Sequence, residues 1–266
     1  MSSILDIVEL RHKAKAYIND FASRGDSINW WNGLLLATAR IDARFDILKE
    51  VVAEDHLLPQ ELLPGAKSVI VYFIPFRKNL VVSNIQGEMA SRDWAQSYVD
   101  TNSLIADLNQ YLSTSLADLG YKSAVTPVTH NFKPERLISG WSHKHIAFLA
   151  GLGRFGMHTQ LITPSGCCGR FGSLVTEAEF GDHPLVQDGE LCRHKVGRNC
   201  LACVKKCRFG ALTEDGFDRF KCYEQLMKND ALYSDMPLTD VCAKCVSIVP
   251  CSFKSAITAK ASNNQE

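Results

Sequence analysis

The stretch from Cys192 to Cys251 decides the architecture, because it holds eight of the chain's ten cysteines. It begins CRHKVGRNCLACVKKC over residues 192–207 and ends CAKCVSIVPC over residues 242–251, with Cys222 between the two runs. Eight thiolates are the number that two four-iron clusters need, and in two-cluster proteins the last cysteine of a run ligates the other cluster. The pattern therefore predicts two 4Fe–4S clusters and a role in electron transfer.

The core of the first run, CLACVKKC over residues 200–207, has the spacing of bacterial ferredoxins with its first cysteine displaced. Gly197 stands where that cysteine is expected, and Cys192 is its replacement. The usual proline after the last cysteine is absent, because Arg208 follows Cys207. The second run is looser, with Pro250 just before Cys251.

Zinc and disulfides are the two alternative uses of these cysteines. An all-cysteine zinc site would combine the two C-x2-C pairs, and it would leave four thiols unexplained. The members of that site would be Cys200, Cys203, Cys242 and Cys245. Disulfides need an oxidising compartment, and the N-terminal residues predict no export. Spacing and count together favour iron–sulfur clusters.

Composition sets the class of protein. The chain has 266 residues, of which 46% are hydrophobic and 22% charged, as is usual for globular proteins. Lys+Arg and Asp+Glu are both 29, so the chain has no net positive charge that would attract nucleic acid. We therefore expect nucleic-acid binding to be unlikely. No apolar signal core, no twin-arginine pair and no run of about 18 apolar residues is found, which predicts a cytoplasmic protein without a membrane span.

Hydrophobic periodicity predicts a mixed chain of helices and strands. The sequence changes at about residue 186 to cysteine-rich short helices and loops. We place a boundary there between an α+β domain over residues 1–185 and a cysteine-rich domain over residues 186–266. Expected helices cover residues 4–21, 97–119 and 141–150, the last with Ser142 as N-cap, and residues 30–53 are expected to be helical or mixed. Expected strands cover residues 68–75, 124–129, 160–163 and 172–176.

A glycine-rich turn, GLGRFG over residues 151–156, matches the dinucleotide pattern G-x-G-x-x-G. That fingerprint requires a preceding strand and a following helix, whereas the expected order here is helix and then strand. A flexible turn is therefore the favoured interpretation. The alternative is a turn in which Gly151, Gly153 and Gly156 let the backbone approach another large cofactor.

Candidate proton donors gather in the sequence Ser142-His143-Lys144-His145 at the start of the expected helix. Neighbouring helical side chains lie about 100° apart, so these cannot share one face. They are either a solvated first turn or a catalytic group, and histidine with a pKa near 6.5 suits proton transfer at neutral pH. His130, which follows an expected strand, is the next candidate.

Two further features surround the next turn. Cys167 and Cys168 lie between Gly166 and Gly169, which is typical of a tight turn, with a reactive thiol as the alternative. Arg170 beside them is either a surface charge or a ligand for a phosphate or carboxylate.

An ordered set of motifs over residues 60–251 resembles the epoxyqueuosine reductases, and the reductive dehalogenases share the same core. LPGAKSVI over residues 63–70 is similar to their first strand, and AGLGRFG over residues 150–156 with LITP over residues 161–164 is similar to their central stretch. GSLVTE over residues 172–177 resembles the motif that follows. The run from Cys200 through CRFGAL at residues 207–212 resembles their C-x2-C-x3-C-P-x-G-A-L.

The resemblance implies a nitroreductase-like, corrinoid-binding type of domain followed by a small two-cluster, ferredoxin-like domain. One cluster would be bound by Cys192, Cys200, Cys203 and Cys251, and the other by Cys222, Cys242, Cys245 and Cys207. Clusters would pass electrons from a partner such as a ferredoxin or flavodoxin to a corrinoid (cobalamin) or flavin-like cofactor. A small-molecule substrate would be reduced there, with His130, His143, Lys144 or His145 as proton donor, and Gly151, Gly153, Gly156 and Arg170 near the cofactor.

The chain departs from the family pattern at three positions. The family's catalytic aspartate falls on Leu137, with Glu135 as the nearest acid, and Arg154 and Met157 replace a tryptophan and a lysine of the central motif. We also expect no C-terminal helical repeats of the kind that contact tRNA. A short divergent relative is the predicted description. The alternative from another class is a non-catalytic electron carrier whose N-terminal part docks a partner.

Overall fold

The computed structural model describes residues 5–24 and 28–257. Its centre is a four-stranded antiparallel sheet in the order β1-β2-β8-β3. The strands are β1 (Leu35–Arg40), β2 (Ser68–Pro75), β3 (Ser123–Val125) and β8 (Gly169–Thr176). β2 pairs with β8 along its full length, from Ser68 opposite Thr176 to Pro75 opposite Gly169.

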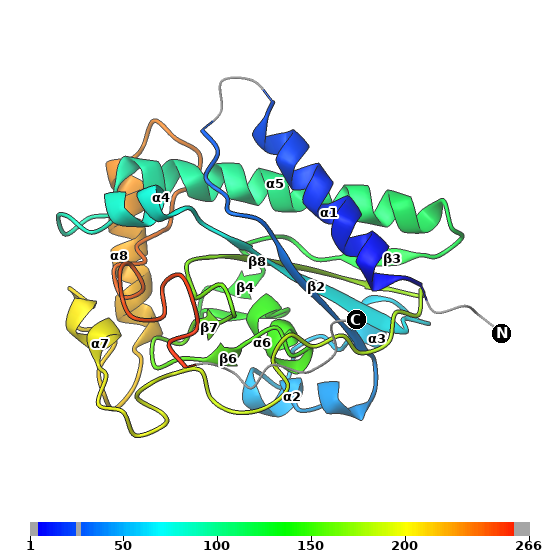
Figure 1. Cartoon of the computed structure of the whole chain (residues 1–266). Coiled ribbons are helices and arrows are strands. Elements are labelled where there is room, and N and C mark those ends of the chain that lie inside the picture. Colours follow the sequence, from blue (N-terminus) through cyan, green and yellow to red (C-terminus); the bar gives the residue numbers. More distant parts are fainter. Residues whose placement is uncertain (1–4, 25–27, 258–266) are drawn as a thin grey trace.

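Helices cover both faces of this sheet, so that the molecule has three layers (Figure 1). One face carries α1 (Ile7–Ala22) and the long α5 (Arg92–Ala117). The other face carries η1 (Ala43–Phe45), α2 (Leu48–Val51), α3 (Pro59–Leu62) and α6 (His143–Leu149). The remaining elements are α4 (Lys78–Ser83), α7 (Ala202–Lys206), α8 (Arg219–Leu232) and the two-stranded pairs β4 (Phe132–Lys133) with β5 (Ile138–Ser139) and β6 (Arg154–Phe155) with β7 (Leu161–Ile162).

Strand β2 shows why the sequence forms this sandwich. All eight of its residues are buried, which explains its unbroken run of β-branched and aromatic side chains. Successive side chains point to opposite faces. Ile70, Tyr72 and Ile74 join the hydrophobic cluster under α1 and α5, whereas the cluster under α6 takes the alternate residues Val69, Val71 and Phe73.

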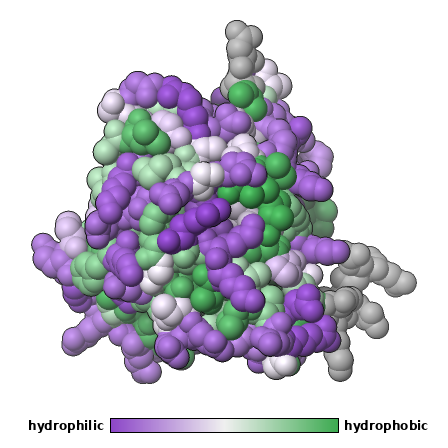
Figure 2. Space-filling view, turned by 90° about the vertical axis from the view of Figure 1, so that its left-hand side faces the viewer, coloured by the Kyte–Doolittle hydropathy of each residue, from purple (hydrophilic) through white to green (hydrophobic). Residues whose placement is uncertain are grey.

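The cysteine-rich segment packs against the end of the sandwich that carries α4 and the start of α5 (Figure 1). Val241 and Val246 belong to the same buried cluster as α1 and α5. Asn84 binds the Cys242 carbonyl through its amide nitrogen at 2.8 Å, and the Lys244 ammonium donates to the Asn84 carbonyl at 2.8 Å. Figure 2 views this end, where hydrophobic surface is visible between hydrophilic side chains.

The expected mixture of helices and strands is confirmed. The division into domains at residue 186 stays a prediction. The helix expected over residues 4–21 corresponds to α1, with Ile4 outside the described residues. The region over residues 30–53 is not mainly helical, because Leu35–Arg40 pairs with β2 as a strand. None of the helices within the described ranges is long and apolar enough to cross a membrane.

The glycine turn after α6 gives a direct test of the packing. A Cβ atom placed on Gly153 would lie 2.3 Å from the carbonyl oxygen of Ile162, a backbone atom that cannot move aside cheaply. We expect Gly153→Ala to destabilise the protein by about 2 kcal/mol, which lowers the thermal unfolding midpoint by roughly 5 °C. Gly216→Ala is the matched control, because nothing lies within 4 Å of the position that its Cβ would take and its φ is not positive. Equal thermal unfolding midpoints for the two variants would contradict this packing.

Candidate functional site

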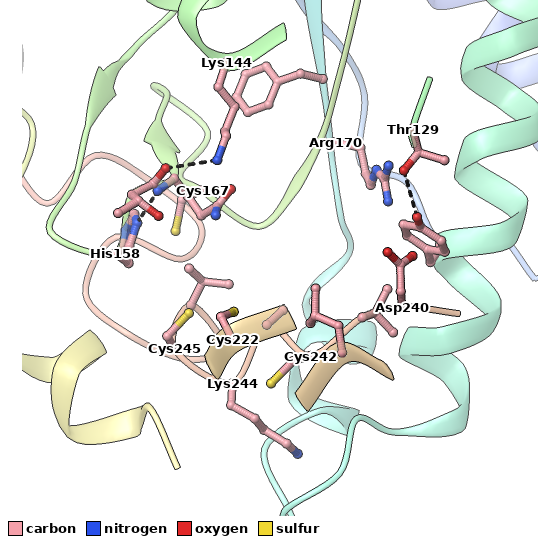
Figure 3. Close-up of a pocket in the computed structure, with 18 of the residues that line it drawn as sticks. Thr129, Lys144, His158, Cys167, Arg170, Cys222, Asp240, Cys242, Lys244 and Cys245 are labelled. Carbon is pink, nitrogen blue, oxygen red and sulfur yellow. Dashed lines mark hydrogen bonds between the residues drawn. The ribbon is translucent and has the colours of Figure 1, made fainter. Parts of the chain in front are cut away.

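A cavity of about 460 Å³ lies where the sandwich meets the cysteine-rich segment. Its walls come from α5 with Trp94 and Tyr98, from the first turn of α6 with His143 and Lys144, and from residues 167–171, which lead into β8. The cysteine-rich segment closes the remaining side. Figure 3 shows Lys144 and His158 on one side, Arg170 and Asp240 on the other, and cysteines along the lower wall.

Six cysteines border this cavity. Two of them are Cys167 and Cys168, and the other four are the set predicted to share one cluster: Cys207, Cys222, Cys242 and Cys245. Burial raises the pKa of Cys222 to about 11, and the nearby thiols of Cys242 and Cys207 raise it further in the same direction. The pKa of Cys245 is also raised, first by burial and then by the charges of Cys242, Cys222, Cys207 and Cys203, the last of which belongs to the other predicted set.

The other predicted set shows the same relation. Burial raises the pKa of Cys203 to about 11, with further contributions from the charges of Cys251 and Cys192. Cys203 lies in the first turn of α7. Cys200 lies just before that helix. The division of the eight thiols into two ligand sets stays a prediction.

The geometry does not support the zinc alternative. Four thiolates on one zinc at about 2.3 Å each must lie roughly 4 Å apart. Within residues 5–24 and 28–257, one group of three or more His, Cys, Asp or Glu side chains has all its ligand atoms within 4.8 Å of one another. That group consists of His158, Cys167 and Cys251. That group does not include the two C-x2-C pairs. All ten cysteines are free thiols, so the disulfide alternative gains no support either.

The environment of Cys251 differs from that of the other candidate ligands. A hydrogen bond with Cys167 lowers its pKa to about 5, and a hydrogen bond with His158 acts in the same direction, although burial opposes both. Its thiolate is thus stabilised at neutral pH by the protein itself.

Lys144 is a buried cation whose charge acts on the cavity's cysteines. Its ammonium donates to the carbonyl oxygen of Thr159 at 3.2 Å. Burial lowers its pKa, whereas the charges of Cys222 and Cys245 raise it. A buried ammonium beside buried thiolates lowers the cost of keeping either charge away from water.

His143 lines the cavity, and its imidazole is held on one side only. Nδ1 lies 2.7 Å from the hydroxyl of Ser173, which also accepts a hydrogen bond from Trp141 Nε1 at 3.0 Å. Nε2 is buried without a hydrogen-bond partner. When Ser173 donates to Nδ1, the proton of the neutral ring lies on Nε2. The free Nε2 can therefore donate to a molecule in the cavity.

The expectation of ordinary histidine pKa values is wrong for two of the candidates. Burial lowers the pKa of His143 to about 4 and that of His145 to about 4, with Lys144 adding to the effect on His145. Both rings are therefore neutral at pH 7. His145 also lies off the cavity wall, because its Nδ1 is 2.7 Å from the Ser142 hydroxyl and its ring packs on Phe155.

The opposite wall combines a cation, a phenol and an acid. The Arg170 guanidinium lies 4.3 Å from the centre of the Tyr98 ring, and burial lowers the pKa of Arg170. The Tyr98 hydroxyl is 3.0 Å from Thr129 Oγ1. His130 has a positive φ of 57° and places Nε2 at 3.2 Å from Asp240. The second oxygen of Asp240, Oδ1, is buried without a partner.

Asp240 is the site residue that sequence reasoning missed. It lies two positions before Cys242, in a stretch with no catalytic motif. The chain returns to the cavity at this point, and Asp240 there contacts His130, which lies 110 positions earlier in the sequence. No local pattern signals such a pairing.

The three glycines of the turn lie at packing contacts rather than on the cavity wall. A Cβ at Gly151 would meet Pro184 at 2.5 Å, and one at Gly156 would meet the His158 ring at 2.8 Å. The turn follows helix α6 and contains the short strand β6, with no helix after it before β7, which is not the dinucleotide order. A role of these glycines toward a cofactor stays a prediction. His130, His143, Lys144 and Arg170 do come together around the cavity.

Comparison with known proteins points to one superfamily. No family profile matches the chain. An epoxyqueuosine reductase of Bacillus cereus is 27% identical over 173 residues, which cover 62% of this chain and 41% of that protein. This chain therefore spans about two fifths of the length of that curated relative.

Solved structures share the fold. An epoxyqueuosine reductase crystallised with a tRNA-Tyr epoxyqueuosine-modified stem loop has a TM-score of 0.56 at 15% identity, over 93% of this chain and 66% of that one. A catabolic reductive dehalogenase in complex with 3-bromo-4-hydroxybenzoic acid has a TM-score of 0.54 at 13% identity, over 83% of this chain and 30% of that one. The resemblance to the epoxyqueuosine reductase and reductive dehalogenase superfamily is confirmed.

Proposed function

We propose that this relative of epoxyqueuosine reductases and reductive dehalogenases is an iron–sulfur reductase that delivers electrons into the cavity between its sheet and its cysteine-rich segment. The observation that carries the proposal is the shared wall. Cys207, Cys222, Cys242 and Cys245 border the same cavity as His143 and Arg170. An electron source and candidate proton-handling groups thus face one space.

The cysteines fit two 4Fe–4S clusters. One set is Cys207, Cys222, Cys242 and Cys245, and the other is Cys192, Cys200, Cys203 and Cys251. Buried thiols with raised pKa values need the positive charge of a bound metal to become thiolates. Bound clusters supply one-electron transfer. Lys144 adds a positive charge beside the cavity set.

The rest of the cavity fits a second redox group and a substrate. Aromatic and aliphatic side chains such as Phe76, Trp94 and Val128 share its walls with polar and charged residues, a mixture that cofactor sites use. Two buried atoms without partners, His143 Nε2 and Asp240 Oδ1, offer a hydrogen-bond donor and an acceptor to whatever occupies it. A corrinoid such as cobalamin is the cofactor that the superfamily resemblance favours, with a flavin as the alternative. A corrinoid, when bound, supplies a redox-active cobalt.

The chain's own groups have defined tasks in this proposal. Arg170 and Tyr98 form a rigid wall that orients the bound molecule, since the guanidinium is stacked on the ring. His143 donates a hydrogen bond to it from Nε2, and His130 with Asp240 is the pair that handles protons. Each two-electron reduction draws two electrons, one at a time, from a partner such as a ferredoxin or flavodoxin.

The substrate is proposed to be a small molecule. Reduced viologen as electron donor, with epoxyqueuosine and a halogenated phenol as candidate acceptors, provides an anaerobic activity assay. Weak binding of nucleic acid stays a prediction from the balanced charge, 29 basic against 29 acidic residues. The tRNA complex noted above belongs to the relative in which it was observed.

A non-catalytic electron carrier is the second candidate, and cofactor content separates the two. We expect anaerobically purified or reconstituted protein to contain about eight irons and eight acid-labile sulfides per chain. We further expect it to bind one corrinoid or flavin, measured by visible absorption with cobalt and flavin analysis. Iron and sulfide without any second cofactor would favour the carrier. About four irons, or stoichiometric zinc, would contradict the two-cluster assignment.

A further inference from the structure

His158 is not one of the eight residues predicted to bind the clusters, and a backbone hydrogen bond orients its imidazole. It sits between β6 and β7 and is 3% exposed. The backbone N–H of Gln160 donates to Nδ1 at 3.1 Å. Because Nδ1 accepts, the proton of the neutral ring lies on Nε2. Nε2 is 3.3 Å from the sulfur of Cys251, so its N–H points to that thiol.

The turn around His158 leaves no other place for the ring. Gly156 has no side chain where a Cβ would lie 2.8 Å from the imidazole. Thr159 takes a positive φ of 59°, a conformation that non-glycine residues rarely adopt. Its carbonyl accepts from Lys144. Strained backbone that orients a buried ring usually reflects a functional constraint.

Cys167 completes the group on the other side of the same sulfur. Ligand atoms of His158, Cys167 and Cys251 all lie within 4.8 Å of one another. The Cys167 backbone N–H also donates to the Cys251 carbonyl at 3.0 Å, which ties the two segments together. Three parts of the chain that are separate in sequence therefore converge on one predicted cluster ligand.

We propose that His158 is a positioning residue whose Nε2–H donates to the thiolate of Cys251 and raises the reduction potential of the cluster held by Cys192, Cys200, Cys203 and Cys251. This inference rests on the proposed function, because it requires that cluster. One electron from an external one-electron donor makes the cluster one charge more negative, and no bond breaks. A hydrogen bond to a ligand sulfur stabilises the more negative state.

The second cluster supplies an internal reference. Its ligand Cys207 accepts from the backbone N–H of Leu212 at 3.3 Å. A change of the His158 side chain leaves that bond in place. Substitution of His158 should therefore shift the potential of one cluster and leave the other unchanged.

The experiment is an EPR-monitored redox titration of the holoprotein. In His158→Met, which keeps bulk but has no donor, the ratio of reduced to oxidised cluster at the wild-type midpoint should fall about tenfold, or 59 mV for a one-electron couple. His158→Gln keeps an N–H donor and should stay near the wild type. His183→Met is the control, because that half-buried ring instead lies 2.9 Å from Thr38 Oγ1.

Each result decides between the possibilities. Unchanged potentials in His158→Met with eight irons bound would overturn the inference and leave the proposed function intact. If His158→Met binds fewer irons, proton hyperfine spectra of the reduced wild type decide, since an exchangeable proton near one cluster is expected and its absence overturns the inference. Zinc, or about four irons, in the wild-type protein would overturn both proposals.

Discussion

Replacing Cys222 with alanine should reduce the iron content from about eight to about four per chain and abolish viologen-linked reduction in the cavity. Cys222 borders the cavity and belongs to the set nearest to it. Without this cluster, electrons that reach the other set have no short route to the cavity. Iron, sulfide and turnover are measured on the same anaerobic preparation.

Two controls accompany this variant. Cys203→Ala removes a ligand of the other set, so it should also leave about four irons while the cavity cluster remains. Cys168→Ala changes a buried cysteine that belongs to neither set and donates to the Val246 carbonyl at 3.2 Å, so eight irons should remain. Eight irons in Cys222→Ala, or four in Cys168→Ala, would contradict the ligand assignment.

Replacing His143 with alanine should slow turnover roughly a hundredfold, the effect of losing a preorganised hydrogen-bond donor, because the buried ring is neutral at pH 7. His143 is the histidine of the first turn of α6 that lines the cavity, and its Nε2 is buried without a partner. Iron content should not change, because the ring contacts Ser173 and no ligand cysteine. The measurement is kcat in the viologen-linked assay at saturating acceptor.

His145→Ala is the matched control for this prediction. Both rings lie in the same turn and burial lowers both pKa values to about 4, yet His145 bonds Ser142 and does not line the cavity. Its loss should leave turnover within a few-fold of the wild type. If His145→Ala is the slower variant, or if His143→Ala keeps full activity, the assignment of His143 as the hydrogen-bond donor is contradicted, with His130 as the next candidate.

Elements with a strong local signal are predictable from sequence. The run over residues 68–75 forms β2 with the predicted bounds, because burial on both faces requires an unbroken apolar stretch. The long helix is expected from residue 97 but begins at Arg92, where Ser91 accepts from the Trp94 N–H as N-cap. The apolar residues 34–36 are ambiguous, since periodicity alone cannot separate a short strand from a helix.

Cavity residues are predictable only where a motif names them. Cysteine spacing indicates both ligand sets, because cluster chemistry fixes the number and type of ligands. The separation of His143 from His145 follows from the 100° step of a helix, but which ring faces the cavity depends on packing against Ser173. Asp240 and His158 reach their partners through tertiary contacts, and burial that lowers histidine pKa values has no sequence signature.

Anomalous diffraction at the iron edge from anaerobically grown crystals tests the central claim most directly. The account predicts two compact groups of iron. One should lie among Cys207, Cys222, Cys242 and Cys245 on the wall of the cavity that His143 and Arg170 share, and the other among Cys192, Cys200, Cys203 and Cys251. A single iron group, a zinc signal in its place, or iron groups that both lie away from the cavity would contradict it.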